Sequence, residues 1–169
     1  MSIHDYKNAS PAIDATAHIF EGARVIGDVT IGKHVSVWFN TVIRGDVAPV
    51  TIGDGTNVQD GTVIHTSRDY PTIIGKHVTI GHSAVVHACT VEDDALIGMH
   101  STILDGAVVE TGAIVAAGTT VPPGKRVPKH TLVMGNPMKA VRSLNESELK
   151  ETKENAEHYI ELMNTYKER

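Results

Sequence analysis

Three histidines, at positions 65, 82 and 87, are the residues of this sequence best suited to chemistry. Three imidazole nitrogens with an open fourth position form the Zn²⁺ arrangement that lowers the pKa of a bound water to about 7. A lone histidine is more often a solvated or hydrogen-bonded residue than a ligand, so spacing must decide whether the three converge. Other polar residues of the same stretch, 43–92, are Arg44, Asp46, Asn57, Gln59 and Asp60.

A six-residue repeat determines where these side chains point. Ile or Val stands at every sixth position from 13 to 43, at 52, 58 and 64, at 74, 80 and 86, and at every sixth position from 91 to 133. Such a period fits neither an α-helix nor an alternating strand, and it is typical of a parallel β-helix, an all-β solenoid. Three hexads form one triangular coil, and the aliphatic side chains stack about 4.8 Å apart on the axis. The repeat predicts about seven coils, with the Gly residues after many aliphatic positions serving corners at positive φ.

The three breaks in the period all fall in the stretch that holds the histidines. The spacing lengthens to nine residues over 43–52 and to ten over 64–74, and it shortens to five over 86–91. Insertions in a solenoid form loops on one face, often the binding face. The breaks therefore point to a site beside these residues.

The repeat places the histidines on two different sides of the predicted prism. His65 and His87 follow aliphatic residues three hexads apart, so they are outward neighbours on one side, with Arg44 in the same position one coil earlier. Asp60 and His82 are equivalent residues on another side. The two groups meet if the side of one chain that carries His65 and His87 faces the side of the next chain that carries His82. Such a heterologous contact closes into a ring of three subunits. The spacing therefore predicts a metal site between the subunits of a homotrimer and leaves a purely structural interpretation of the histidines open.

The division of the chain follows from where the repeat ends. Residues 1–137 are predicted to form the hexapeptide-repeat β-helix domain, and residues 138–169 a linker and an amphipathic helix. Asn145 with Glu148 three residues later predicts a capped helix start. Apolar residues at spacings of three and four then predict a helix of about 20 residues that packs on the prism or on a neighbour.

Composition excludes several classes of function. A formal charge of −5 and the absence of a basic patch argue against a nucleic-acid partner. The sequence has no apolar run of 18 residues or more, so we expect no membrane partner. The single Cys89 cannot form an intrachain disulfide, which favours a cytoplasmic location.

The polar residues of this stretch resemble those of a known family. The sequence is similar to the gamma-class carbonic anhydrases of the left-handed parallel β-helix superfamily, and the likeness extends to the Gly135-Asn136-Pro137 turn and the C-terminal helix. The segments that carry it are Arg44-Gly45-Asp46, Asn57-Val58-Gln59-Asp60-Gly61, His65, Gly81-His82 and His87.

The resemblance implies a lyase reaction, the reversible hydration of CO₂ to bicarbonate by a metal-bound hydroxide. It implies that His65 and His87 of one chain and His82 of its neighbour bind Zn²⁺, or alternatively Fe²⁺ or Co²⁺. Gln59 would orient the hydroxide, and Asn57 would position CO₂ or the proton in transit.

The resemblance also assigns residues around the metal. Arg44 would pair with Asp60 across the subunit interface, Asp46 would belong to the same network, and Tyr159 would reach the site from the helix. A structural ion pair that sets the register of the trimer is an equally good interpretation of the first three residues.

The sequence departs from the family where its most active members carry an acidic loop. Val47 and Arg68 stand where those acids are expected, and Asp69 is the only acid in the short insertion 67–71. We therefore expect weak proton shuttling and low turnover.

Two alternatives remain open at this point. Many hexapeptide-repeat proteins are coenzyme A-dependent acyltransferases, and the Gly135-Asn136-Pro137 tail resembles theirs; such an enzyme needs one catalytic histidine and usually a longer loop. A non-catalytic metal-binding or assembly protein would need the same three histidines.

Overall fold

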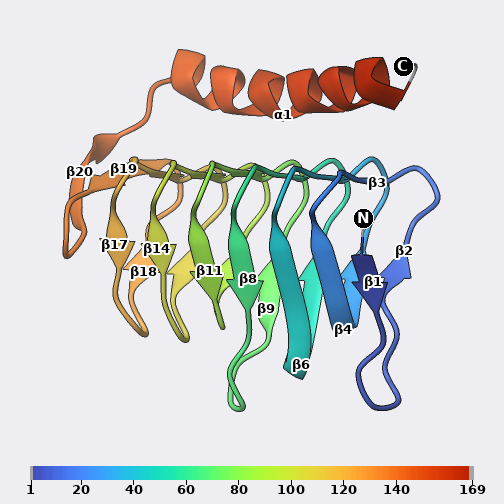
Figure 1. Ribbon diagram of the computed structural model, residues 1–169. Coiled ribbons are helices and arrows are strands. Elements are labelled where there is room, and N and C mark those ends of the chain that lie inside the picture. The colour runs from blue at the N-terminus through green and yellow to red at the C-terminus, as the bar shows by residue number, and fades with distance from the viewer. Residues whose placement is uncertain (1, 168–169) are drawn as a thin grey trace.

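The computed structural model describes residues 2–167, which form a triangular prism of stacked strands with one helix lying along it (Figure 1). We call its three sides A, B and C. Side A consists of β1 (Ser2–His4), the first parts of β4 (Arg24–Ile31) and β6 (Val42–Ile52), β8 (Val63–His65), β11 (Val85–His87), β14 (Thr102–Ile103) and β17 (Thr120–Val121). Side B consists of β2 (Ala12–Ile13), the later parts of β4 and β6, β9 (Thr72–Ile74), β12 (Thr90–Val91), β15 (Val108–Val109) and β18 (Arg126–Val127).

Side C carries the helix. Its strands are β3 (His18–Ile19), β5 (Ser36–Val37), β7 (Asn57–Val58), β10 (Thr79–Ile80), β13 (Leu96–Ile97), β16 (Ile114–Val115), β19 (Thr131–Met134) and β20 (Lys139–Ser143). All strand pairs of the prism are parallel except the last, because β20 turns back and pairs antiparallel with β19. This strand was not predicted, and it extends the sheet past residue 137; the domain boundary drawn there stays a prediction.

The aliphatic column predicted from the repeat forms the core. Every repeat position from 19 to 133 is buried, and Ile13, at the open end, is partly buried. On side A, Ile43 pairs with Ile64, which pairs with Val86. Each such side chain contributes about 1.5–3 kcal/mol on burial. The repeat therefore predicted the parallel β-helix correctly, and the left-handed form with one C-terminal helix agrees with the family resemblance.

The glycines that follow the aliphatic residues have a different role from the predicted one. Gly53 and Gly81 do not have positive φ. A Cβ on Gly53 would lie 2.6 Å from the backbone of Gly75, and one on Gly81 would lie 2.7 Å from the Met99 nitrogen. Close contact between successive coils, rather than positive φ, requires glycine there.

The helix α1 (Glu146–Lys167) lies along side C. The predicted cap is present: Asn145 Oδ1 accepts a hydrogen bond from the Glu148 amide at 3.0 Å, and the Asn145 amide donates to the Glu148 carboxylate at 2.9 Å. Met163 of the helix is buried against the stacked rings of Phe20 and Trp38. Within residues 2–167, no helix is long and apolar enough to cross a membrane.

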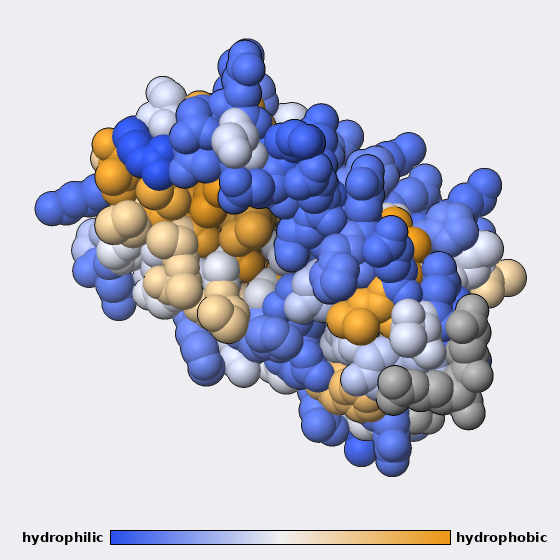
Figure 2. Space-filling view, turned by 90° about the horizontal axis from the view of Figure 1, so that it is seen from above, coloured by the Kyte–Doolittle hydropathy of each residue, from blue (hydrophilic) through white to orange (hydrophobic). Residues whose placement is uncertain are grey.

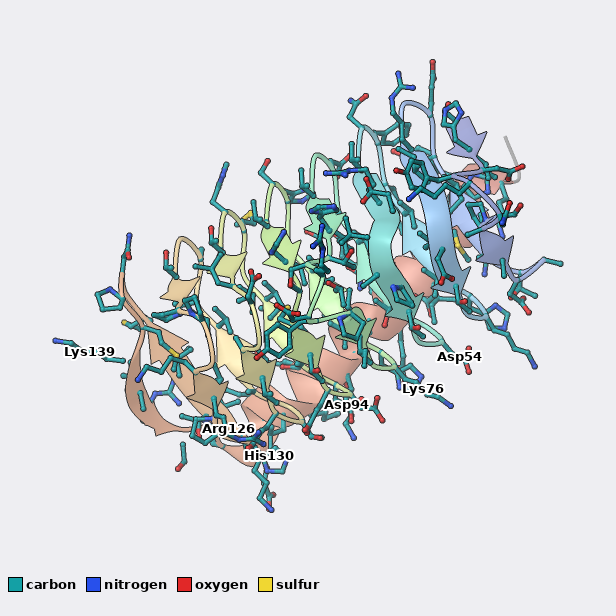
Figure 3. All side chains as sticks on the ribbon, turned by 90° about the horizontal axis from the view of Figure 1, so that it is seen from below. Asp54, Lys76, Asp94, Arg126, His130 and Lys139 are labelled. Atoms are coloured by element: carbon teal, nitrogen blue, oxygen red, sulfur yellow. The ribbon has the colours of Figure 1, made fainter. Side chains whose placement is uncertain are left out.

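Charged side chains line one edge of the prism, where Asp54, Lys76, Asp94, Arg126 and His130 follow one another (Figure 3). Lys76 Nζ lies 3.6 Å from Asp54 Oδ2, and Lys153 of α1 reaches Asp94 at 3.2 Å. Since these exposed pairs contribute about 0–1 kcal/mol each, they add little to stability.

Candidate metal site

Two of the three predicted ligands lie side by side on side A. His65 and His87 are register partners on the adjacent strands β8 and β11, as the repeat predicted. His65 Nδ1 lies 3.1 Å from His87 Nε2, and the ring centroids are 5.1 Å apart. Thr72 fixes the chain beside them, because its hydroxyl donates to the His65 carbonyl at 2.5 Å and accepts from the Ala88 amide at 2.9 Å.

A carboxylate binds the other nitrogen of each ring. Asp46 Oδ1 lies 2.9 Å from His65 Nε2, and Asp105 Oδ1 lies 2.7 Å from His87 Nδ1. Burial opposes ionisation of Asp46, but hydrogen bonds from His65 and Arg44 hold the pKa of its carboxyl below the ordinary value. Burial likewise opposes ionisation of Asp105, and contacts with His87 and Ser67 keep its pKa low.

These partners determine which ring nitrogens are free. An ionised carboxylate only accepts hydrogen bonds, so the nitrogens facing Asp46 and Asp105 must carry the hydrogens. In neutral imidazoles, His65 Nδ1 and His87 Nε2 then both present lone pairs, 3.1 Å apart. Two lone pairs at this distance repel each other unless a cation lies between them. Two nitrogens bound to one tetrahedral Zn²⁺ are about 3.3 Å apart, given Zn–N bonds of 2.0–2.1 Å, so the pair fits a metal ion.

The third predicted ligand lies on side C and has the same kind of partner. His82 Nδ1 is 2.8 Å from Asp60 Oδ2, which leaves Nε2 free. The side chain of His82 is 43% exposed, against 19% for His65. Within residues 2–167 of a single chain, no three His, Cys, Asp or Glu side chains form a group that could hold a metal ion. Within one chain, His82 therefore does not join the side A pair in such a group, and the ligand roles stay predictions.

A polar network extends from Gln59 to the helix. The buried Gln59 donates through Nε2 to Asn57 Oδ1 at 3.1 Å, and Asn57 Nδ2 donates to Thr79 Oγ1 at 2.9 Å. Asn155 of α1 donates to the same Thr79 oxygen at 3.0 Å. Because the Gln59 amide nitrogen is used, its Oε1 oxygen is left to accept a bond from a bound group.

A largely apolar cavity of about 420 Å³ lies beside this network, between side C and α1. Gln59, His82 and Tyr159 are among its polar lining residues, and Leu96 and Met99 belong to its apolar lining. Figure 2 shows apolar surface beside the hydrophilic back of the helix. Burial, followed by the nearby Asp60 charge, raises the pKa of Tyr159. The helix thus brings Tyr159 to the cavity that His82 lines, and its place in the metal site stays a prediction.

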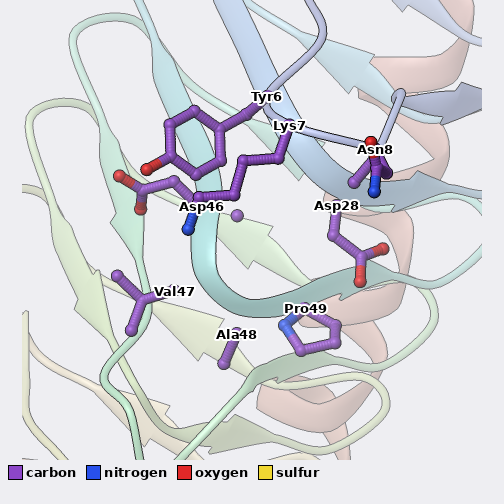
Figure 4. A pocket seen from close by; sticks show the side chains of 10 residues that line it. Tyr6, Lys7, Asn8, Asp28, Asp46, Val47, Ala48 and Pro49 are labelled. Carbon is purple, nitrogen blue, oxygen red and sulfur yellow. The ribbon is translucent and has the colours of Figure 1, made fainter.

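The two insertions lie next to the side A pair. The Ala48 amide in the first donates to Thr66 Oγ1, at the start of the second, at 3.1 Å. The first insertion continues strand β6 instead of forming a loop, because residues 50–52 keep pairing with β4 and β9. It also borders a second cavity of about 410 Å³, where Asp46 lies near Tyr6 and Lys7 (Figure 4). Asp46, which lines this cavity, also contacts His65 Nε2 at 2.9 Å and so connects the cavity to the pair.

The charged residues form different pairs within one chain than those expected between chains. Arg44 pairs with Asp46, and Asp60 pairs with His82. The predicted bond between Arg44 and Asp60 of a neighbour stays a prediction.

Two residues of this region were not identified from the sequence, Asp105 and Asn155. Asp105 stands two residues after the repeat position Ile103, the phase that Asp60 and His82 share, and this was the available signal. No sequence signal pointed to Asn155, because its partner Thr79 is 76 residues away in the chain.

Similarity to known proteins decides the family. The model of the hexapeptide repeat of succinyl-transferase matches residues 89–122. A probable carbonic anhydrase from Methanocaldococcus jannaschii is 52% identical over 153 residues, which cover 90% of this chain and 96% of that protein. The mitochondrial gamma carbonic anhydrase 2 of Arabidopsis thaliana is 46% identical over 159 residues. The chain belongs to the gamma carbonic anhydrase-like family.

Two further findings limit what membership of this family says about function. The match covers 90% of this chain but 57% of the Arabidopsis protein. A crystal structure of a hexapeptide transferase family protein from Anaplasma phagocytophilum superposes with a TM-score of 0.94, at 46% identity and 97% coverage of both chains. The family therefore shares its fold with proteins described as transferases, so the residues of the site must carry the functional conclusion.

Proposed function

We propose that the protein catalyses the reversible, metal-dependent hydration of CO₂ to bicarbonate at sites between the subunits of a homotrimer. The observation that carries this proposal is the pair of facing imidazole nitrogens, His65 Nδ1 and His87 Nε2, whose separation of 3.1 Å suits two ligands of one metal ion. His82 of the neighbouring chain completes the ligand set. Zn²⁺ is the expected metal, with Fe²⁺ or Co²⁺ as alternatives, because imidazole suits all three.

The bound metal would supply the nucleophile, because it lowers the pKa of a coordinated water to about 7. Gln59 would orient the reacting oxygen through Oε1, since Asn57 fixes the rotation of its amide group. The apolar lining beside His82 suits CO₂, which is uncharged and small. Asn57 is held by Thr79, so the network connects the reacting region to α1.

Three further residues of the proposed site, Asp46, Arg44 and Asp60, contact other side chains of the site. Asp46 binds His65 and also Arg44, and across the interface Arg44 would bind Asp60 and set the register of the trimer. Proton release would be slow, because Val47 and Arg68 stand where the most active members of the family carry acids, and Asp69 is the only acid of the insertion 67–71. The lone Cys89, a buried free thiol, supports a cytoplasmic location.

The test is a CO₂ hydration assay on protein stripped of metal and reloaded with Zn²⁺ or Fe²⁺. Activity should appear only after loading, and Gln59→Ala should lower it without removing the metal. Loaded protein that hydrates CO₂ no faster than buffer contradicts the proposal and leaves the non-catalytic metal-binding protein.

A coenzyme A-dependent acyltransferase is the second candidate, favoured by the likeness to the Anaplasma transferase family structure and by a cavity much larger than CO₂ needs. Coenzyme A should raise the melting temperature if this candidate is correct, by mass action on the folded state. Such an enzyme would also keep its activity in His65→Ala and His87→Ala if it uses His82 alone.

A further inference from the structure

We propose that Asp105 is a positioning residue for the metal site, which holds His87 with Nδ1 protonated and Nε2 directed at His65. This inference rests on the proposed metal-dependent function. Asp105 stands at the corner after β14, one coil beyond His87, and its carboxylate oxygen lies 2.7 Å from His87 Nδ1. A hydrogen bond to an ionised acceptor is about twice as strong as one between neutral groups.

The backbone around Asp105 is fixed by bonds to the coils on both sides. The Gly106 amide donates to the Ala88 carbonyl at 2.8 Å, and the Gly124 amide donates to the Asp105 carbonyl at 2.9 Å. The carboxylate is thus presented from the prism itself rather than from a free loop. A group that orients a ligand works best on such a rigid element.

The second insertion packs over the same corner. The Ser67 side chain lies close enough to the Asp105 carboxylate to help lower its pKa, and the Ser67 amide donates to the Tyr70 carbonyl at 3.1 Å. The Tyr70 ring lies against Gly106, where a Cβ would meet its Cζ atom at 3.2 Å. The insertion after His65 therefore helps to hold the carboxylate that orients His87.

The three histidines share this arrangement, because each has one aspartate on its non-ligand nitrogen. Asp46 binds His65, Asp60 binds His82 and Asp105 binds His87. Carboxylates placed this way fix the ring tautomer and raise the basicity of the ligating nitrogen. Without Asp105, His87 is free to carry its hydrogen on Nε2, and that nitrogen then cannot bind a metal.

The experiment compares full-length wild-type protein with Asp105→Ala, Asp105→Asn and Asp105→Glu. Competition with a chelator gives the Zn²⁺ affinity, and ¹⁵N spectra of histidine-labelled, metal-free protein give the His87 tautomer. We expect Asp105→Ala to lower the affinity about 10–100-fold and to move the metal-free His87 towards the Nε2–H form. Asp105→Glu, which keeps the carboxylate, should recover part of the affinity.

Asp93→Ala is the matched control. Asp93 Oδ1 accepts a hydrogen bond from the Lys76 amide at 2.7 Å, so this change also removes a corner carboxylate but touches no histidine. It should leave both readouts unchanged. The inference is wrong if Asp105→Ala and Asp105→Asn bind Zn²⁺ as wild type does, or if affinity falls while the His87 tautomer stays the same. Wild-type protein that binds metal but hydrates no CO₂ contradicts only the proposed function.

Discussion

Mixing two inactive variants tests whether each metal site uses two chains. His65→Ala removes a ligand from side A, and His82→Ala removes one from side C. Either variant alone should bind no metal at high affinity, because every site of its trimer lacks one ligand. A mixed trimer differs, since a His82→Ala chain still offers an intact side A and a His65→Ala chain an intact side C.

The expected recovery follows from the geometry of a closed ring. In every mixed trimer, one interface of the three joins the intact side A to the intact side C. Equal amounts of the two variants, refolded together, give about three quarters mixed trimers. The mixture should therefore bind metal at about one quarter of the wild-type amount per chain, with CO₂ hydration recovered in the same proportion.

Metal analysis of the purified trimers measures this recovery. A mixture of His65→Ala with His87→Ala is the control, because both changes damage side A and no interface is repaired. Mixed trimers that form but recover no metal would refute the two-chain site. High-affinity binding by His82→Ala alone would refute it as well.

Three further outcomes follow from the structure. Replacing the fully buried Ile97 by Ala should lower the free energy of unfolding by about 2–5 kcal/mol, measured in urea at fixed protein concentration. Burial raises the pKa of Cys89 to about 12, so about one thiol in 10⁴ is ionised at pH 8, and a thiol reagent should react only after unfolding. The Arg142 hydrogen bond lowers the pKa of Glu148 to about 2, below its ordinary 4.5. This bond therefore stabilises the folded protein above pH 4.5 and is lost as the pH falls through 2, so the stability difference between wild type and Glu148→Gln should shrink over that range.

The sequence alone predicted the features that recur from one coil to the next along the prism. Because successive coils stack in register, an aliphatic residue every six positions fixes both the buried column and the outward neighbours of each side. The repeat alone places His65 beside His87 in this way. The helix start at Asn145 was equally predictable, because capping depends on residues only three apart.

The repeat was insufficient where contacts do not follow its period. The antiparallel return of β20 and the bond from Asn155 to Thr79 join segments that no periodicity relates. The position of α1 depends on rings from two early coils, Phe20 and Trp38, packing against Met163. Sequence spacing cannot rank such contacts against their alternatives, because packing energy depends on the shapes of the surfaces that meet.

By itself, the sequence determined the coil, its core and the side of the prism on which each histidine lies, because a strict period leaves one way to stack. Only the tertiary structure decided which nitrogen of each ring is free, because Asp46, Asp60 and Asp105 approach the rings from neighbouring coils. The tautomer of a ligand depends on the partner of its other nitrogen, and that partner is identified by distance in space.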